Sequence, residues 1–152
     1  MEALQTERGY AEPRVIQFSV FLDNRVGKLR ELLNLFVGTD VHMAALTVVD
    51  SADCAIVRCV LAPSEMARRM LLSGGIPFSE TELVVAELPS SDALPDVCEA
   101  LVAAEVNIHY AYPLIIKPHG HSAVALHIDE PGMGGTVLRR KGFVMLGEAD
   151  MH

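Results

Sequence analysis

The residues best suited to bind a small molecule lie together in segment 22–29, which reads LDNRVGKL. This segment separates a strand-like run from a helix-like run, so Gly27 lies where a helix is expected to begin. Backbone N–H groups there lack partners, and a glycine leaves them accessible to a carboxylate. Asp23 and Asn24 add oxygens that either cap the helix or accept hydrogen bonds from an ammonium group. The segment predicts either an ordinary capped turn or a zwitterion site.

A second turn, at residues 88–95 (LPSSDALP), occupies the equivalent place in the other half of the chain but has no glycine. Asp92 puts a negative charge where a ligand carboxylate would have to lie. Ser91 or Asp92 followed by Pro95 is typical of a plain helix start. We expect this turn to be structural, which leaves one binding turn per chain.

The histidines are the other residues that could carry chemistry. His119 and His121 are close in sequence, and His109 or His127 could supply a further metal ligand. The surrounding KPHGHS, however, is typical of an exposed hairpin loop. The chain also lacks a nucleophile elbow and a phosphate-binding loop. We therefore expect no metal, no cofactor and no catalytic residue.

The elements that must position these residues form a repeat. The hydrophobic pattern predicts strands at 15–22, 41–50, 55–62 and 76–82, with helices at 29–36 and 63–73. The same order begins again with a strand at 83–88, at an offset of about 68 positions. Both halves predict the order β-α-β-β-α-β, which is the ferredoxin-like signature. We expect an α+β protein with an arm at 1–13, units at 14–82 and 83–152, and antiparallel sheets with helices on one face.

Composition limits the class of partner. The chain has 152 residues, is 51% hydrophobic and carries a formal charge of −8, which argues against nucleic acid and anionic membranes. The N-terminal residues are polar and acidic, and no apolar run is long enough to span a bilayer. Cys54, Cys59 and Cys98 lie in apolar stretches and are interpreted as reduced packing residues. We expect a cytoplasmic protein.

The strand at 41–50 is apolar on both faces. Strict alternation would place Val41, Met43, Ala45 and Thr47 against the helices and His42, Ala44, Leu46 and Val48 on the opposite face. Such a strand indicates a sheet that is covered on both sides, by the other repeat or by a second chain. We expect a homodimer or a larger assembly.

The repeat unit with its first turn FLDNRVGKLREL resembles the ACT domain, a small amino-acid-sensing regulatory fold. Asp23, Asn24, Gly27 and Leu29 match the pattern of that family, whereas Val26 stands where a proline is common. The junction FSETELVVAEL resembles that of stand-alone proteins with two ACT domains in tandem, some of which are labelled as relatives of acetolactate synthase. The resemblance covers residues 14–150.

The resemblance implies a non-catalytic regulatory module that binds a small amino acid where two ACT units meet. It points to Asp23, Asn24, Arg25, Val26, Gly27, Lys28 and Leu29, with Asn107, His109 and Tyr110 as candidates for the opposing wall. The implied partners are an amino acid, a second copy of the chain and a separate biosynthetic enzyme, with branched-chain synthesis as the suggested pathway.

Two other functions remain open. Ferredoxin-like dimers can carry isomerase or lyase chemistry, for which His109, Tyr110 and His127 would be the acid–base candidates. A pairing module that binds no ligand is the other, because the second turn lacks its glycine.

Overall fold

The computed structural model describes residues 13–152, so the expected arm at 1–13 falls almost entirely outside the described residues. The first half contains β1 (Val15–Asp23), α1 (Lys28–Asn34), β2 (His42–Asp50), β3 (Cys54–Ala62) and α2 (Ser64–Ser73). After β4 (Phe78–Leu88) come α3 (Ala93–Ala103), β5 (Ile108–Pro113), β6 (Ser122–Ile128), α4 (Pro131–Arg140) and β7 (Met145–Leu146). Two short 3-10 helices are η1 (Pro118–Gly120) and η2 (Glu148–Asp150).

The strand β4 belongs to both repeats. Its first part pairs with β1, from Phe78 to Leu83, and its second part pairs with β6, from Val84 to Leu88. The sequence predicts strands at 76–82 and 83–88, with strand-like residues that run continuously from 78 to 88, and the structure joins them in one extended segment of 11 residues that serves both repeats. The result is a seven-stranded sheet in the order β2-β3-β1-β4-β6-β5, with β7 added to β4.

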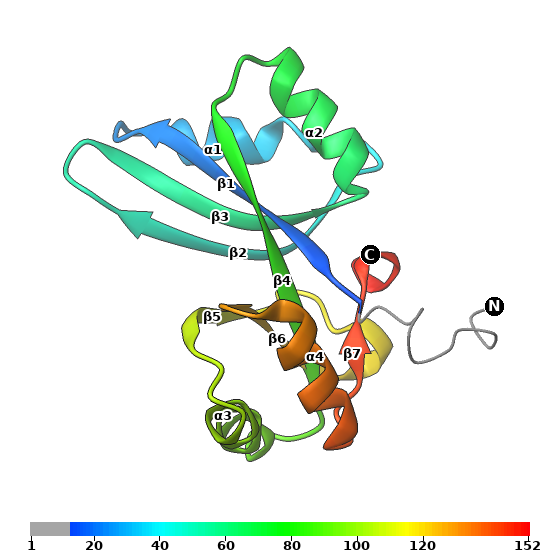
Figure 1. Cartoon of the computed structure of the whole chain (residues 1–152). Coiled ribbons are helices and arrows are strands. Elements are labelled where there is room, and N and C mark those ends of the chain that lie inside the picture. Colours follow the sequence, from blue (N-terminus) through cyan, green and yellow to red (C-terminus); the bar gives the residue numbers. More distant parts are fainter. Residues whose placement is uncertain (1–12) are drawn as a thin grey trace.

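The helices cover the outer sides of this sheet, as Figure 1 shows, with α1 and α2 over one half and α3 and α4 over the other. One hydrophobic core lies under each helix pair, around Phe18 and Leu71 in the first repeat and around Leu101 and Leu126 in the second. All pairings between the strands are antiparallel. The predicted tandem ferredoxin-like α+β fold is confirmed.

A third core lies between the two halves of the sheet and includes Val15, Val60, Leu83, Tyr112 and Met151. The two halves face each other here, so the inner face of the first repeat is covered in part by the second repeat. β2 also meets the segment that directly follows β5, through a bridge between Ala45 and Leu114 and a 2.7 Å hydrogen bond from Ile115 N–H to Ala44 C=O.

A β-bulge between Met43 and Ala45 changes which face the residues of β2 occupy. Ala44 and Ala45 both lie in the core between the two halves, whereas Leu46 packs on the helix side. Strict alternation had placed Ala45 toward the helices and Leu46 away from them, and the extra residue reverses both assignments.

The helices of the second repeat also differ from simple expectation. The interior glycines of α4 suggest a short or mobile helix, but it has 10 residues, the same number as α2. Gly134 and Gly135 are buried, so these glycines allow close packing. In α3, Leu94 has the sequence spacing of an apolar stripe with Val97 and Leu101, but it is 39% exposed. The α-helices found in 13–152 have 7 to 11 residues each, and none of the helices there is a candidate for a membrane span.

Candidate ligand-binding site

The turn between β1 and α1 has the backbone conformation that its glycine predicts. Gly27 has φ 89° and ψ −9°, a left-handed conformation that residues with a Cβ rarely adopt. A Cβ at Gly27 would meet no atom within 4 Å, so the backbone faces open space. The N–H of Lys28 donates to Arg25 C=O at 3.3 Å, whereas the N–H groups of Gly27 and Leu29 find no acceptor within residues 13–152. These two amides are available to a ligand.

The polar side chains of the turn bind one another and the neighbouring strand. Asn24 Nδ2 donates to Asp50 Oδ1 at 3.1 Å, which ties the turn to the end of β2. Arg25 forms a 3.5 Å ion pair with Asp23. No side chain caps α1, so the capping alternative does not apply to Asp23 or Asn24 in this structure.

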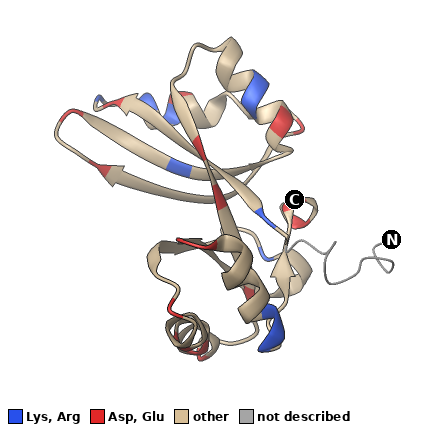
Figure 2. Cartoon of the chain, viewed as in Figure 1, with Lys and Arg blue, Asp and Glu red and all other residues tan. Residues whose placement is uncertain are grey.

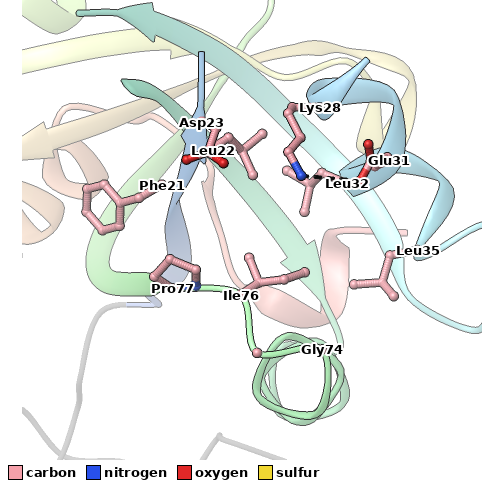
Figure 3. A pocket seen from close by; sticks show the side chains of 11 residues that line it. Phe21, Leu22, Asp23, Lys28, Glu31, Leu32, Leu35, Gly74, Ile76 and Pro77 are labelled. Carbon is pink, nitrogen blue, oxygen red and sulfur yellow. Dashed lines mark hydrogen bonds and ion pairs between the residues drawn. The ribbon is translucent and has the colours of Figure 1, made fainter. Parts of the chain in front are cut away.

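A cavity of about 390 Å³ lies beside the turn, between the end of β1, α1 and the connection from α2 to β4. Figure 3 shows its lining residues, with the Lys28 ammonium directed toward Glu31 and the side chains of Leu32, Leu35 and Ile76 around the same space. The distance from Lys28 Nζ to Glu31 Oε1 is 3.5 Å. The cavity therefore combines charged groups of both signs with an apolar wall.

Two of the seven turn residues expected in the site, Asp23 and Lys28, line this cavity, whereas Asn24, Arg25, Val26, Gly27 and Leu29 do not. Sequence reasoning missed Glu31 and the wall at residues 74–77. The position of this wall could have been predicted from the fold topology. Because β4 pairs antiparallel with β1, the start of β4 must lie beside the end of β1. The hydrogen bond of 3.0 Å from Phe21 N–H to Pro77 C=O marks this contact.

The expected opposing wall lies elsewhere in the chain. Tyr110 is hydrogen-bonded to Gln17, in the middle of β1, and the guanidinium of Arg58 lies 3.9 Å from the centre of its ring. His109 and Asn107 are exposed near the same end of β5. None of Asn107, His109 and Tyr110 lines the cavity at the turn. Within one chain, the ten expected residues therefore form two separate groups.

The loop with His119 and His121 is more than an exposed hairpin connection. His119 Nδ1 lies 2.9 Å from Glu87 Oε2, and its Nε2 lies 3.2 Å from Asp150 Oδ1. Because both ring nitrogens face carboxylates, these contacts raise the pKa of His119, chiefly through the hydrogen bond with Glu87. Pro118 beside it is buried. Over residues 13–152, the structure contains no set of three His, Cys, Asp or Glu side chains arranged to hold a metal ion.

In the second repeat, Asp92 is the residue before α3 and makes no side-chain cap. Its backbone is helical, with φ −78° and ψ −10°, unlike the left-handed backbone of Gly27. The two turns therefore differ in conformation as well as in sequence.

Comparison with solved structures shows the same overall fold in other proteins. Protein BT0572 from Bacteroides thetaiotaomicron has a TM-score of 0.82 and 23% identity, covering 92% of this chain and 96% of that chain. The ligand-free regulatory subunit of aspartate kinase from Thermus thermophilus has a TM-score of 0.57 and 7% identity, covering 86% of this chain and 94% of that chain. A structure of aspartokinase alpha and beta subunits has a TM-score of 0.53 and 10% identity, covering 86% and 97%.

No curated protein matches the sequence. The family described as the ACT domain pair matches it over residues 14–150, which is nearly the whole of the described chain. The duplicated fold, the shared β4 and this match lead to one conclusion: the chain belongs to the ACT domain pair family.

Proposed function

We propose that this protein is a non-catalytic regulatory module that binds a small amino acid at the turn between β1 and α1. The observation that supports this is the cavity of about 390 Å³ lined by Asp23 and Lys28 of this turn, which lies in the size range of small-molecule sites. Lys28 is suited to the ligand carboxylate, together with the free amides of Gly27 and Leu29. Asp23 and Glu31 are suited to the ammonium group.

The apolar wall suggests the kind of side chain. Leu22, Leu32, Leu35 and Ile76 line the cavity beside the charged groups, so an aliphatic amino acid would bury apolar surface there. Branched-chain amino acids are the first ligands to test, because the sequence resemblance links the chain to relatives of acetolactate synthase. A regulatory role is supported by the solved structure of similar fold that is described as the regulatory subunit of aspartate kinase.

The proposed regulation works through differential affinity. A ligand that favours one arrangement of two units shifts the population toward that arrangement, and a partner enzyme then responds to it.

We propose a homodimer as the working assembly. Around the turn, Phe21, Leu29 and Val26 are 37%, 36% and 104% exposed, which leaves apolar surface for a second chain. Sedimentation that shows only a 16.5 kDa species at micromolar concentration would exclude the dimer.

The cysteines bear on the compartment of the protein. Cys54, Cys59 and Cys98 are all unpaired, which suits a reducing compartment such as the cytoplasm.

The three candidates for the opposing wall differ in exposure. Asn107 and His109 are exposed and can contact a neighbouring chain, whereas Tyr110 is hydrogen-bonded to Gln17 of its own chain.

The experiment is a thermal-shift screen of the twenty amino acids followed by calorimetric titration. A ligand at one hundred times its dissociation constant adds about 2.7 kcal/mol to the free energy of unfolding if it binds only the folded state. Lys28→Gln should weaken binding at least tenfold, while Arg30→Gln, on the exposed side of the same helix, should not change it. The absence of any shift with every amino acid would refute the proposal.

A further inference from the structure

A cluster of basic and aromatic side chains lies where the first repeat meets the second, away from the cavity at the turn. It consists of Arg58 on β3, His127 on β6, and His109 and Tyr110 on β5; we call it the basic cluster. Arg58 Cζ lies 3.9 Å from the centre of the Tyr110 ring. The His127 ring centre lies 4.8 Å from that of Tyr110 and 4.8 Å from that of His109.

Within residues 13–152, the basic cluster has no acidic partner. Arg58, His109 and His127 form no salt bridge with any residue of the described chain, although the protein as a whole is acidic. Arg58 is the basic residue in the sequence CAIVRCVLA of β3, and Figure 2 shows blue on this strand. Burial lowers the pKa of His127, and the nearby His109 and Arg58 lower it further. The three groups therefore repel one another when charged.

Two polar atoms of the cluster are also left without partners. Arg58 Nε and His127 Nδ1 are buried, and neither has a hydrogen-bond partner in the part of the chain that the structure describes. Burying a polar group without a partner is unfavourable, and more so if the group is charged. Such groups are uncommon in folded proteins and require an explanation.

We propose that the basic cluster is a second binding site, for a small oxyanion such as the carboxylate or phosphate group of a metabolite. The planar guanidinium of Arg58 offers parallel N–H donors that match two oxygens of such a group, and the Tyr110 ring holds the guanidinium by a cation–π contact. His127 and His109 supply further donors when protonated. An anion there offsets the repulsion among the three basic groups.

The position of the cluster gives the anion a structural effect. Arg58 belongs to the first repeat and the other three residues to the second, so a bound anion contacts both repeats. Anion binding then strengthens the association of β3 with β5 and β6, independently of any amino acid at the turn. The proposal does not depend on the function proposed above, and either can fail without the other.

The test uses sulfate, which stays doubly charged across the working pH range, and succinate as a carboxylate probe, each compared with chloride at equal ionic strength. Histidine signals in ¹³C NMR spectra report His127 and His109 directly. We expect saturable shifts of both histidines, a higher pKa for His127 when the anion is bound, and tighter binding at pH 6 than at pH 8. Saturation with sulfate alone identifies a phosphate-type site, and saturation with succinate alone identifies a carboxylate site.

Variants separate a built site from general charge effects. Arg58→Gln should weaken the binding of the probe at least tenfold, and Arg58→Lys should restore part of it. Arg69→Gln removes the same charge at an exposed position of α2 and should leave binding unchanged. Lys28→Gln, at the turn, should also leave it unchanged. The proposal would be overturned by NMR shifts that are linear in probe concentration or equal for sulfate, succinate and chloride. Shifts that Arg58→Gln leaves unaltered would also overturn it. If Arg58→Gln is poorly folded, the wild-type titration alone decides.

Discussion

Gln17 donates a 2.8 Å hydrogen bond from Nε2 to the hydroxyl of Tyr110, a residue 93 positions later in the chain. Tyr112 in turn donates to Gln17 Oε1 at 2.5 Å. Gln17 is fully buried, so both hydrogen bonds are shielded from water. One amide thereby joins β1 of the first repeat to β5 of the second, and a buried polar network of this kind fixes their relative register.

Replacing the Gln17 side chain should lower the free energy of unfolding. Gln17→Leu leaves the hydroxyl of Tyr112 buried without its acceptor and that of Tyr110 without its donor, and each orphaned group costs about 1–3 kcal/mol. We expect urea denaturation to show a loss of about 3 kcal/mol. Adding Tyr112→Phe to Gln17→Leu should recover part of this loss, because both partners are then apolar. Equal stability of Gln17→Leu and the wild type would contradict the role given to the network.

The close packing of α4 gives a second prediction. A Cβ at Gly134 would lie 2.2 Å from Ile128 Cδ1 and 3.4 Å from Leu101 Cδ2, both of which are buried. Gly134→Val should therefore destabilise the protein by about 2 kcal/mol or more, despite the better helix propensity of valine. Met133→Val at the neighbouring exposed position is the control and should change thermal stability little. Similar stabilities of the two variants would show that α4 can move away from β6.

The pH dependence of stability should reflect the protonation of His119. Its pKa is raised by Glu87 of β4 and Asp150 of η2, so its contribution is fully present below the unfolded pKa of about 6.5 and is lost as pH rises through the folded value. We expect the Tm difference between the wild type and His119→Asn to be largest near pH 6 and to shrink above it. Asparagine tolerates the left-handed backbone at this position, where φ is 57°. A difference that is constant from pH 6 to pH 9 would disprove the link.

The cysteines should differ in reactivity. Burial raises the pKa of the Cys59 thiol to about 12, whereas Cys54 and Cys98 are partly exposed. At pH 8, iodoacetamide should modify Cys54 and Cys98 in the native protein while Cys59 remains protonated and protected. Mass spectrometry of the peptides measures this, and all three should react in urea. Rapid native modification of Cys59 would indicate that the core of the first repeat opens readily.

Local sequence patterns were sufficient to predict most of the helices and strands and the backbone conformation of the turn at 22–29. The apolar spacing placed the helices and most strands, and the one glycine of segment 22–29 marked the left-handed position. The same patterns show strand-like residues running continuously from 78 to 88, but they do not show where the pairing changes from β1 to β6. Nor could they show the bulge in β2, since Ala44 and Ala45 are too small to mark a face.

The contacts that the sequence could not predict join segments that are far apart in the chain. His119 meets Glu87 and Asp150, which lie more than thirty positions away on either side. Arg58 and Tyr110 come together only because the two repeats face each other. The wall of Asn107, His109 and Tyr110 follows from a family pattern and stays a prediction for a neighbouring unit, while within the chain residues 74–77 lie beside the turn.

The shared strand has a mechanical consequence. Because a single extended backbone from Phe78 to Leu88 carries the hydrogen bonds of both halves, neither half can rotate about it without twisting the pairing of the other. β4 runs without a break through the middle of the described chain, so it couples the two halves mechanically. A small rotation that begins next to Ile76 is therefore transmitted along the strand toward Glu87.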